Sequence, residues 1–214
     1  MDKIKRLADK ADYSLQTAYD ILDANTLCHI AFIDDDRPMS IPMAYWRIDN
    51  SIYFHAANKG RFEKSTIGKK ICVSVATVKE FVLARSGFEH TYNYESVVIH
   101  GVPTSVDNSI EKYEVLKAFI EGLYPDRWSQ LKAIKDSELR ATKVLKLDIE
   151  NFACKVRQGA PDDTSMGTDY PVWAGEIPIN QSLGKPIQDG ILKKGAPDSP
   201  LSFVYLETLK RFEH

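Results

Sequence analysis

Between residues 27 and 57 the chain runs through short apolar segments that are separated by turn residues and not by helices. The apolar segments are Leu27–Ile33, Pro38–Arg47 and Ile52–Ala57, and the intervening turns are Asp34-Asp35-Asp36 and Asp49-Asn50. Short strands joined by tight turns are typical of an antiparallel meander. Consecutive strands of this kind favour an α+β fold with an antiparallel barrel over a doubly wound parallel sheet.

The rest of the chain adds helices around this core. Ser14 is a plausible N-cap for a helix that ends at about Ala24. Further helices are predicted at Lys59–Gly68, Ile110–Leu123, Arg127–Ile134, Asp136–Ala141 and Ser202–Phe212, and further strands at Ile71–Val78, Phe81–Arg85, Ser96–Val106, Lys143–Glu150 and Phe152–Val156. We expect a single domain over residues 1–214, with a barrel core at about 26–157 and a C-terminal arm and helix at about 158–214.

Composition excludes several classes of function. The net charge is −2, from 28 basic and 30 acidic residues, which argues against non-specific nucleic-acid binding. The three cysteines form no CxxC pair, so we expect free thiols, a reducing cytosol and no metal site. The charged N-terminus lacks the apolar core of a signal peptide, and no apolar run is long enough to span a bilayer. The sequence predicts a cytoplasmic protein without a membrane segment.

The segment HAANKGRF, which begins at His55, predicts a strand that leads through a turn into a helix. Backbone N–H groups at a helix start can bind an anion, and Gly60 allows a ligand to approach the backbone closely. Arg61 can bind a phosphate through two N–H donors of its guanidinium group, and Lys59 adds positive charge. The segment therefore predicts a phosphate-binding turn, although an ordinary solvated helix face would have the same charges.

Pro42 marks the strand that precedes this turn. Proline cannot donate a hydrogen bond to a neighbouring strand, so it belongs at a sheet edge or a bulge. Where strand pairing is interrupted, backbone N–H and C=O groups lack a partner strand. These groups could hydrogen-bond to the edge of a polar heterocycle. An ordinary edge strand is the alternative interpretation.

Four segments together resemble the pyridoxamine 5'-phosphate oxidase-like, FMN-binding split-barrel superfamily, and within it the flavin-nucleotide-binding subgroup that includes Nim-type nitroreductases. They are RPMSIPMAYW, IYFHAANKGRF, VLARSGFEHTYNYESVVIHG and YPVWAGEIPI. The resemblance implies an antiparallel split β-barrel with peripheral helices that forms a homodimer, with FMN at the subunit interface. The cofactor-binding residues that it implies are Ser40, Ile41, Pro42, Met43, Ala44, Tyr45, His55, Ala56, Gly60, Arg61, Phe62, Ser96 and Trp173. We also expect Lys59, for its charge at the turn, and Asn93, for its closeness to Ser96, to contact the cofactor.

The same resemblance implies a function. We expect an FMN-dependent oxidoreductase that reduces a small-molecule acceptor such as a nitro compound or a quinone. The run after Trp173 lacks the arginine–histidine pair of the oxidases, and Phe62 stands where they often have lysine, so pyridoxamine phosphate oxidation is not expected. The alternatives are a non-catalytic FMN-binding carrier or sensor, and a haem-binding split barrel. His55 has three possible roles: cofactor contact, catalysis or structure. No Ser–His–Asp or paired-carboxylate site can be argued from the sequence, and the catalytic residues are left open.

Overall fold

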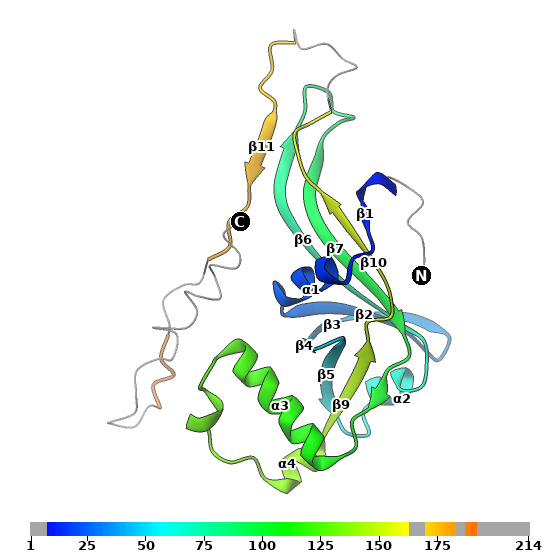
Figure 1. Ribbon diagram of the computed structural model, residues 1–214, viewed down its shortest axis with the longest axis vertical. Coiled ribbons are helices and arrows are strands. Elements are labelled where there is room, and N and C mark those ends of the chain that lie inside the picture. The colour runs from blue at the N-terminus through cyan, green and yellow to red at the C-terminus, as the bar shows by residue number, and fades with distance from the viewer. Residues whose placement is uncertain (1–7, 163–169, 183–186, 192–214) are drawn as a thin grey trace. The chain divides into compact units, whose positions relative to one another are not determined.

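The strands of the protein form two antiparallel sheets, as a computed structural model that describes residues 8–162, 170–182 and 187–191 shows (Figure 1). The first sheet has the order β1-β10-β7-β6-β2-β3, and β11 also pairs with β6. Its strands are β1 (Ala11–Asp12), β2 (Leu27–Asp34), β3 (Arg37–Ala44), β6 (Ile71–Leu83), β7 (Thr91–Gly101), β10 (Asn151–Arg157) and β11 (Gly175–Pro178). The second sheet has the order β4-β5-β9-β8. Its strands are β4 (Trp46–Ile48), β5 (Ser51–Ala57), β8 (Thr104–Ser105) and β9 (Thr142–Asp148).

Each sheet is the centre of one of two compact units. The first unit contains residues 1–43, 70–101 and 149–181, and the second contains 44–69, 102–148 and 182–214. The barrel core that we expected at 26–157 therefore takes segments from both units. The α+β class and the antiparallel split barrel are confirmed, and the described strands do not close into a single sheet. The predicted helix at Ser202–Phe212 lies outside the described residues.

Helix α1 (Leu15–Asp23) begins where the sequence predicts. The Ser14 side chain accepts a hydrogen bond from the backbone N–H of Gln16, which satisfies one of the free donors of the first turn. Ala18, Ile21 and Leu22 are buried at helical spacing, and the helix packs against β6, β7 and β10. A short 3₁₀ turn, η1 (Ala8–Lys10), precedes it.

The hairpin of β2 and β3 is formed by a two-residue turn. Asp35 and Asp36 have φ angles of 47° and 60°, which suit the strongly twisted turns of antiparallel hairpins. β3 is the last strand of its sheet, so the predicted edge position of Pro42 is confirmed. The single strand predicted at Pro38–Arg47 is wrong. β3 ends at Ala44 and β4 pairs with β5, so the two halves bond to different sheets.

Within the described part of the chain, β6 and β7 form the longest hairpin (Figure 1). The two strands predicted at Ile71–Val78 and Phe81–Arg85 are one strand, because β6 continues through an irregularity between Val78 and Glu80. β11 then pairs with the far half of β6, from Glu80 to Leu83. The arm expected around Tyr170–Pro178 therefore contributes a strand to the sheet.

Helix α3 (Ser109–Leu123) covers one face of the second sheet. Its contact centres on Val115, which packs with Trp46, Tyr53 and Val144. The helix bounds are confirmed. Of the helices predicted at Arg127–Ile134 and Asp136–Ala141, the first is only the 3₁₀ turn η2 (Trp128–Gln130) and the second is α4 (Asp136–Ala141). In the part of the chain that the structure describes, no helix is both long and apolar enough to cross a membrane.

Candidate functional site

The predicted phosphate-binding turn connects β5 to helix α2 (Arg61–Thr66). The helix is shorter than the predicted Lys59–Gly68, because Lys59 has a left-handed backbone with φ of 60° and Gly60 is the N-cap. The Gly60 N–H donates to the Ala57 carbonyl over 3.2 Å. A Cβ atom at Gly60 would lie 3.0 Å from that same carbonyl oxygen, so the chain itself, before any ligand, favours glycine here.

Glu63 fixes the shape of this turn. Its Oε2 accepts a hydrogen bond of 2.5 Å from the backbone N–H of Lys59, and its Oε1 lies 3.4 Å from the Lys143 ammonium. Lys143 also donates to Ser105 over 2.8 Å and to Asp107 over 3.0 Å. The turn is thus tied to β8 and β9 by charged groups that sequence reasoning missed. The available signal for the first link was the position of Glu63 as the third residue of the helix after Gly60, from which a glutamate can reach back to a backbone N–H at the helix start.

The side chains of this turn differ in exposure. Lys59 and Arg61 are exposed, whereas Gly60 and Phe62 are half-buried. The N–H of Lys59 is already used by Glu63 and that of Gly60 by Ala57, so neither is open to an anion. The side chains of Lys59 and Arg61 add positive charge at the turn. The turn keeps its backbone fixed and presents its positive charges to solvent.

His55 precedes the turn on β5 and lies beside two aromatic rings. Its ring centroid is 6.0 Å from that of Trp46 and 5.6 Å from that of Phe119. Burial of the imidazole against these rings lowers the pKa of His55 from its ordinary value. The residue as a whole stays exposed, so a neutral imidazole is accessible at the end of the strand. Its neighbour Ala56 is half-buried.

The residues of the segment Ser40–Tyr45 become more buried toward its end. On β3, Ser40 and Pro42 are exposed, while Ile41 and Met43 are half-buried on the opposite face. Ala44 ends the strand half-buried, and Tyr45 after it is buried. The Cys28 thiol donates to the Met43 carbonyl over 3.4 Å, and burial raises the pKa of that thiol to about 12, so it stays a neutral donor.

Asn93 lies at the centre of a polar cluster in the first unit and is 1% exposed. Its amide Nδ2 donates to the carboxylates of Glu80 and Glu176, and its Oδ1 accepts from Arg157. Because Glu176 lies on β11, the amide links that strand to the sheet. The cofactor contact expected for Asn93 stays a prediction, and the structure shows that its polar side-chain atoms already have partners within the chain.

Ser96 and Trp173 lie in different parts of the first unit. Ser96 is half-buried at the middle of β7, opposite Ala76 on β6. Two strands, β6 and β2, separate β7 from β3 in the sheet order. Trp173 is 63% exposed and its ring covers Gly175, where a Cβ atom would lie 2.9 Å from the ring.

The expected site residues therefore form one contiguous group and several separate ones. His55 to Phe62 lie together on β5, the turn and α2 of the second unit. Ser40 to Met43 occupy the β3 edge of the first unit, away from Ser96 in the order of strands. No cluster of three or more histidine, cysteine or acidic side chains suited to a metal occurs among the residues that the structure describes.

Three solved structures have folds similar to that of this chain. A flavocytochrome from Azotobacter vinelandii is 32% identical, with 91% of each chain covered and a TM-score of 0.88. An FAD- and haem-binding protein from Mycobacterium smegmatis is 28% identical, with 89% of this chain and 94% of that chain covered and a TM-score of 0.84. A 5-nitroimidazole resistance protein from Bacteroides thetaiotaomicron shares the fold at 17% identity, with 68% of this chain and 86% of that chain covered and a TM-score of 0.56.

No curated protein sequence matches the chain significantly. The family model described as pyridoxamine 5'-phosphate oxidase matches residues 14–156. These residues include both sheets apart from β1, the last residue of β10 and β11. The chain belongs to the pyridoxamine 5'-phosphate oxidase family.

Proposed function

We propose that this protein binds a flavin and uses it as an oxidoreductase on a small-molecule acceptor. The observation that carries the proposal is similarity at about 30% identity to two solved proteins, over about nine tenths of each chain, one a flavocytochrome and the other a binder of FAD and haem. A bound flavin would supply the hydride and electron chemistry itself. The protein would then hold the cofactor and shape access to it, and such a scheme needs no nucleophile from the protein.

The second unit offers the residues suited to the flavin phosphate. Arg61 and Lys59 are exposed cations on either side of Gly60, in a turn whose backbone Glu63 holds in place. Arginine can bind phosphate through two parallel N–H groups, and a fixed turn reduces the entropy lost on binding. FMN and FAD both carry this phosphate, so the turn suits either flavin.

The first unit, taken by itself, has an exposed sheet edge at β3. At β3 the prolines reduce pairing with a further strand, and Ser40 is exposed. Ser96 and Trp173 lie at other positions of the same unit, which fits a site completed by a second copy of the chain. A homodimer is therefore part of the proposal, and light scattering of the purified protein measures its mass directly.

The three free cysteines are consistent with a reducing, cytoplasmic compartment.

Replacement of Arg61 by alanine tests the phosphate site. The loss of a charge-assisted hydrogen bond costs about 1.5–3 kcal/mol, so flavin affinity falls by about one to two decades. Fluorescence titration with FMN and with FAD measures the change, and Lys64→Ala on the same helix is the control for loss of one exposed positive charge. Unchanged affinity in a folded Arg61→Ala protein would place the phosphate elsewhere.

Reduction by a nicotinamide donor tests the enzymatic part. In stopped-flow experiments, NADH or NADPH should bleach the flavin absorbance, and a nitro compound or a quinone should restore it. A flavin that stays oxidised with both donors would favour a carrier or sensor over an oxidoreductase.

Haem binding is a second candidate, because both of the more similar solved proteins are named as a flavocytochrome or a haem binder. Titration of the purified protein with haemin should give a Soret band that saturates at a fixed ratio to flavin. Saturation without loss of flavin would show that both groups bind together. A Soret band that appears only as flavin is released would show competition for one site.

A further inference from the structure

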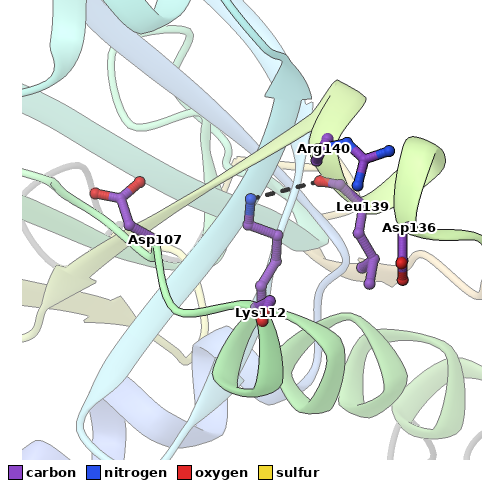
Figure 2. Close-up of a pocket in the computed structure, with 6 residues that line it drawn as sticks. Asp107, Lys112, Asp136, Leu139 and Arg140 are labelled. Carbon is purple, nitrogen blue, oxygen red and sulfur yellow. Dashed lines mark hydrogen bonds between the residues drawn. The ribbon is translucent and has the colours of Figure 1, made fainter.

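A cavity of about 350 Å³ lies between the start of α3 and helix α4 in the second unit (Figure 2). Its lining residues are Asp107, Ser109, Lys112, Asp136, Leu139 and Arg140. Ligand sites in proteins typically measure about 300–1,000 Å³, so this cavity suits one small group rather than a whole dinucleotide. None of its lining residues belongs to the set expected from sequence for the flavin.

The cavity adjoins the phosphate-binding turn. The backbone N–H of Asn58 donates to the Ala141 carbonyl over 2.9 Å, and the Asn58 side chain donates to the Arg140 carbonyl over 2.8 Å. Lys143 makes a second connection, because its ammonium contacts both Glu63 behind the turn and Asp107 at the cavity. The turn and α4 are thus held together by direct hydrogen bonds within one compact unit.

The polar groups of the cavity carry both charges. The Lys112 ammonium donates to the carbonyl oxygen of Leu139 over 3.4 Å (Figure 2). It also donates to the carbonyl oxygen of Thr142 over 3.1 Å, and so holds the end of α4 in place. The guanidinium of Arg140 makes no ion pair with any residue that the structure describes. A guanidinium can bind a phosphate through two parallel N–H groups.

Two other side chains suit the remainder of a nucleotide. Asp136 presents a carboxylate, the group that commonly accepts hydrogen bonds from ribose hydroxyls. Leu139 supplies an apolar surface of the kind on which an adenine ring packs. A cation, a carboxylate and an apolar side chain in one small cavity match the phosphate, sugar and base of a nucleoside monophosphate.

We propose that this cavity binds the adenosine monophosphate half of FAD, whose flavin phosphate lies at the Lys59–Arg61 turn. The inference rests on the proposed flavin binding and makes it more specific, because FMN lacks this half. The cavity then selects FAD over FMN, while the turn binds the part that the two flavins share. The FAD- and haem-binding protein from Mycobacterium smegmatis, 28% identical to this chain, shows that FAD binding occurs in a protein of this fold.

The test compares the two flavins in the same variants. In the Arg140→Ala protein, the affinity for FAD should fall by about tenfold, as for loss of a charge-assisted contact, while the affinity for FMN changes less than about twofold. Lys132→Ala, which removes an exposed positive charge of the same unit outside the cavity lining, should change neither affinity. Isothermal titration calorimetry measures both dissociation constants, and circular dichroism verifies that each variant is folded.

A second measurement uses the wild-type protein and AMP as a probe. AMP should lower the apparent affinity for FAD and leave the affinity for FMN unchanged, since only FAD would occupy the cavity. An equal loss of both flavins in Arg140→Ala, or no loss of either, would overturn the assignment of the cavity while flavin binding stands. AMP that binds without competing with FAD would also overturn it. Failure of the wild type to bind either flavin would remove the proposed function together with this inference.

Discussion

The two compact units use their polar side chains in opposite ways. In the first unit, the Asn93 amide is buried and satisfied by Glu80, Glu176 and Arg157, so it holds strand β11 on the sheet. In the second unit, Glu63 and Lys143 lie beneath a turn whose cations stay exposed. Both regions were expected from sequence to contact the cofactor. The difference shows that a polar residue near a candidate site can serve the scaffold, and that burial and bonding partners reveal which role it has.

Replacement of Asn93 by leucine should have the largest effect on stability. The change removes the amide, so the two carboxylates and the guanidinium lose the hydrogen bonds that they make with it. We expect this loss to lower the free energy of unfolding by about 2–3 kcal/mol. Urea denaturation followed by circular dichroism measures the loss. Asn180→Leu, at an exposed position just after β11, is the control and should stay within about 0.5 kcal/mol of wild type. An Asn93→Leu protein as stable as this control would mean that the amide does not hold β11.

Replacement of Gly60 by alanine should have a smaller effect, confined to the turn of the second unit. The φ of −72° at Gly60 suits alanine, but the new Cβ would lie 3.0 Å from the Ala57 carbonyl. We expect a loss of about 1 kcal/mol in stability as the turn shifts, together with weaker binding of both flavins. Thermal melts and flavin titrations measure the two effects. Gly87→Ala, at a loop position with open space around it, is the control. A Gly60→Ala protein with unchanged flavin affinity would show that the shape of the turn does not matter for binding.

The pH dependence of the two units should differ in sign, with the smallest effects of this series. Burial lowers the pKa of His55 from 6.5, so the folded state favours the neutral ring. Its stabilising contribution is complete above pH 6.5 and is lost as the pH falls through the lower pKa of the folded state. The His55→Gln protein should therefore lose less stability than wild type when the pH falls below 6.5. Equal losses in the two proteins would argue against this contribution.

The opposite trend is expected at Glu176. The hydrogen bond with Glu80 raises the pKa of Glu176 above 4.5, so the folded state favours the protonated form. This contribution is complete below pH 4.5 and is lost as the pH rises through the raised pKa. Hydrogen exchange of the β11 amides should therefore quicken with pH beyond its intrinsic dependence in wild type, and this excess should disappear in the Glu176→Gln protein. An excess that persists in Glu176→Gln would mean that the carboxyl pair does not control the pairing of β11.

Local patterns predicted much of the secondary structure. Helix α1 with its Ser14 cap, helix α3 and the acidic turn at Asp35-Asp36 follow from spacing and turn chemistry over a few residues. The errors occur where distant strands decide the result. The break at Tyr45 reflects pairing of β4 with β5, and the continuity of β6 depends on its pairing with β7, β2 and β11.

The sequence by itself determined the antiparallel α+β architecture, the edge position of Pro42 and the strand–turn–helix that presents Lys59 and Arg61. Each of these depends on interactions between residues close in the chain or on what a proline or glycine backbone permits. Only the tertiary structure decided that Asn93 is buried and hydrogen-bonded to Glu80, Glu176 and Arg157, and that Arg140 lies beside Asn58. These contacts join residues separated by as many as 83 positions, and no local period records which distant side chains will meet.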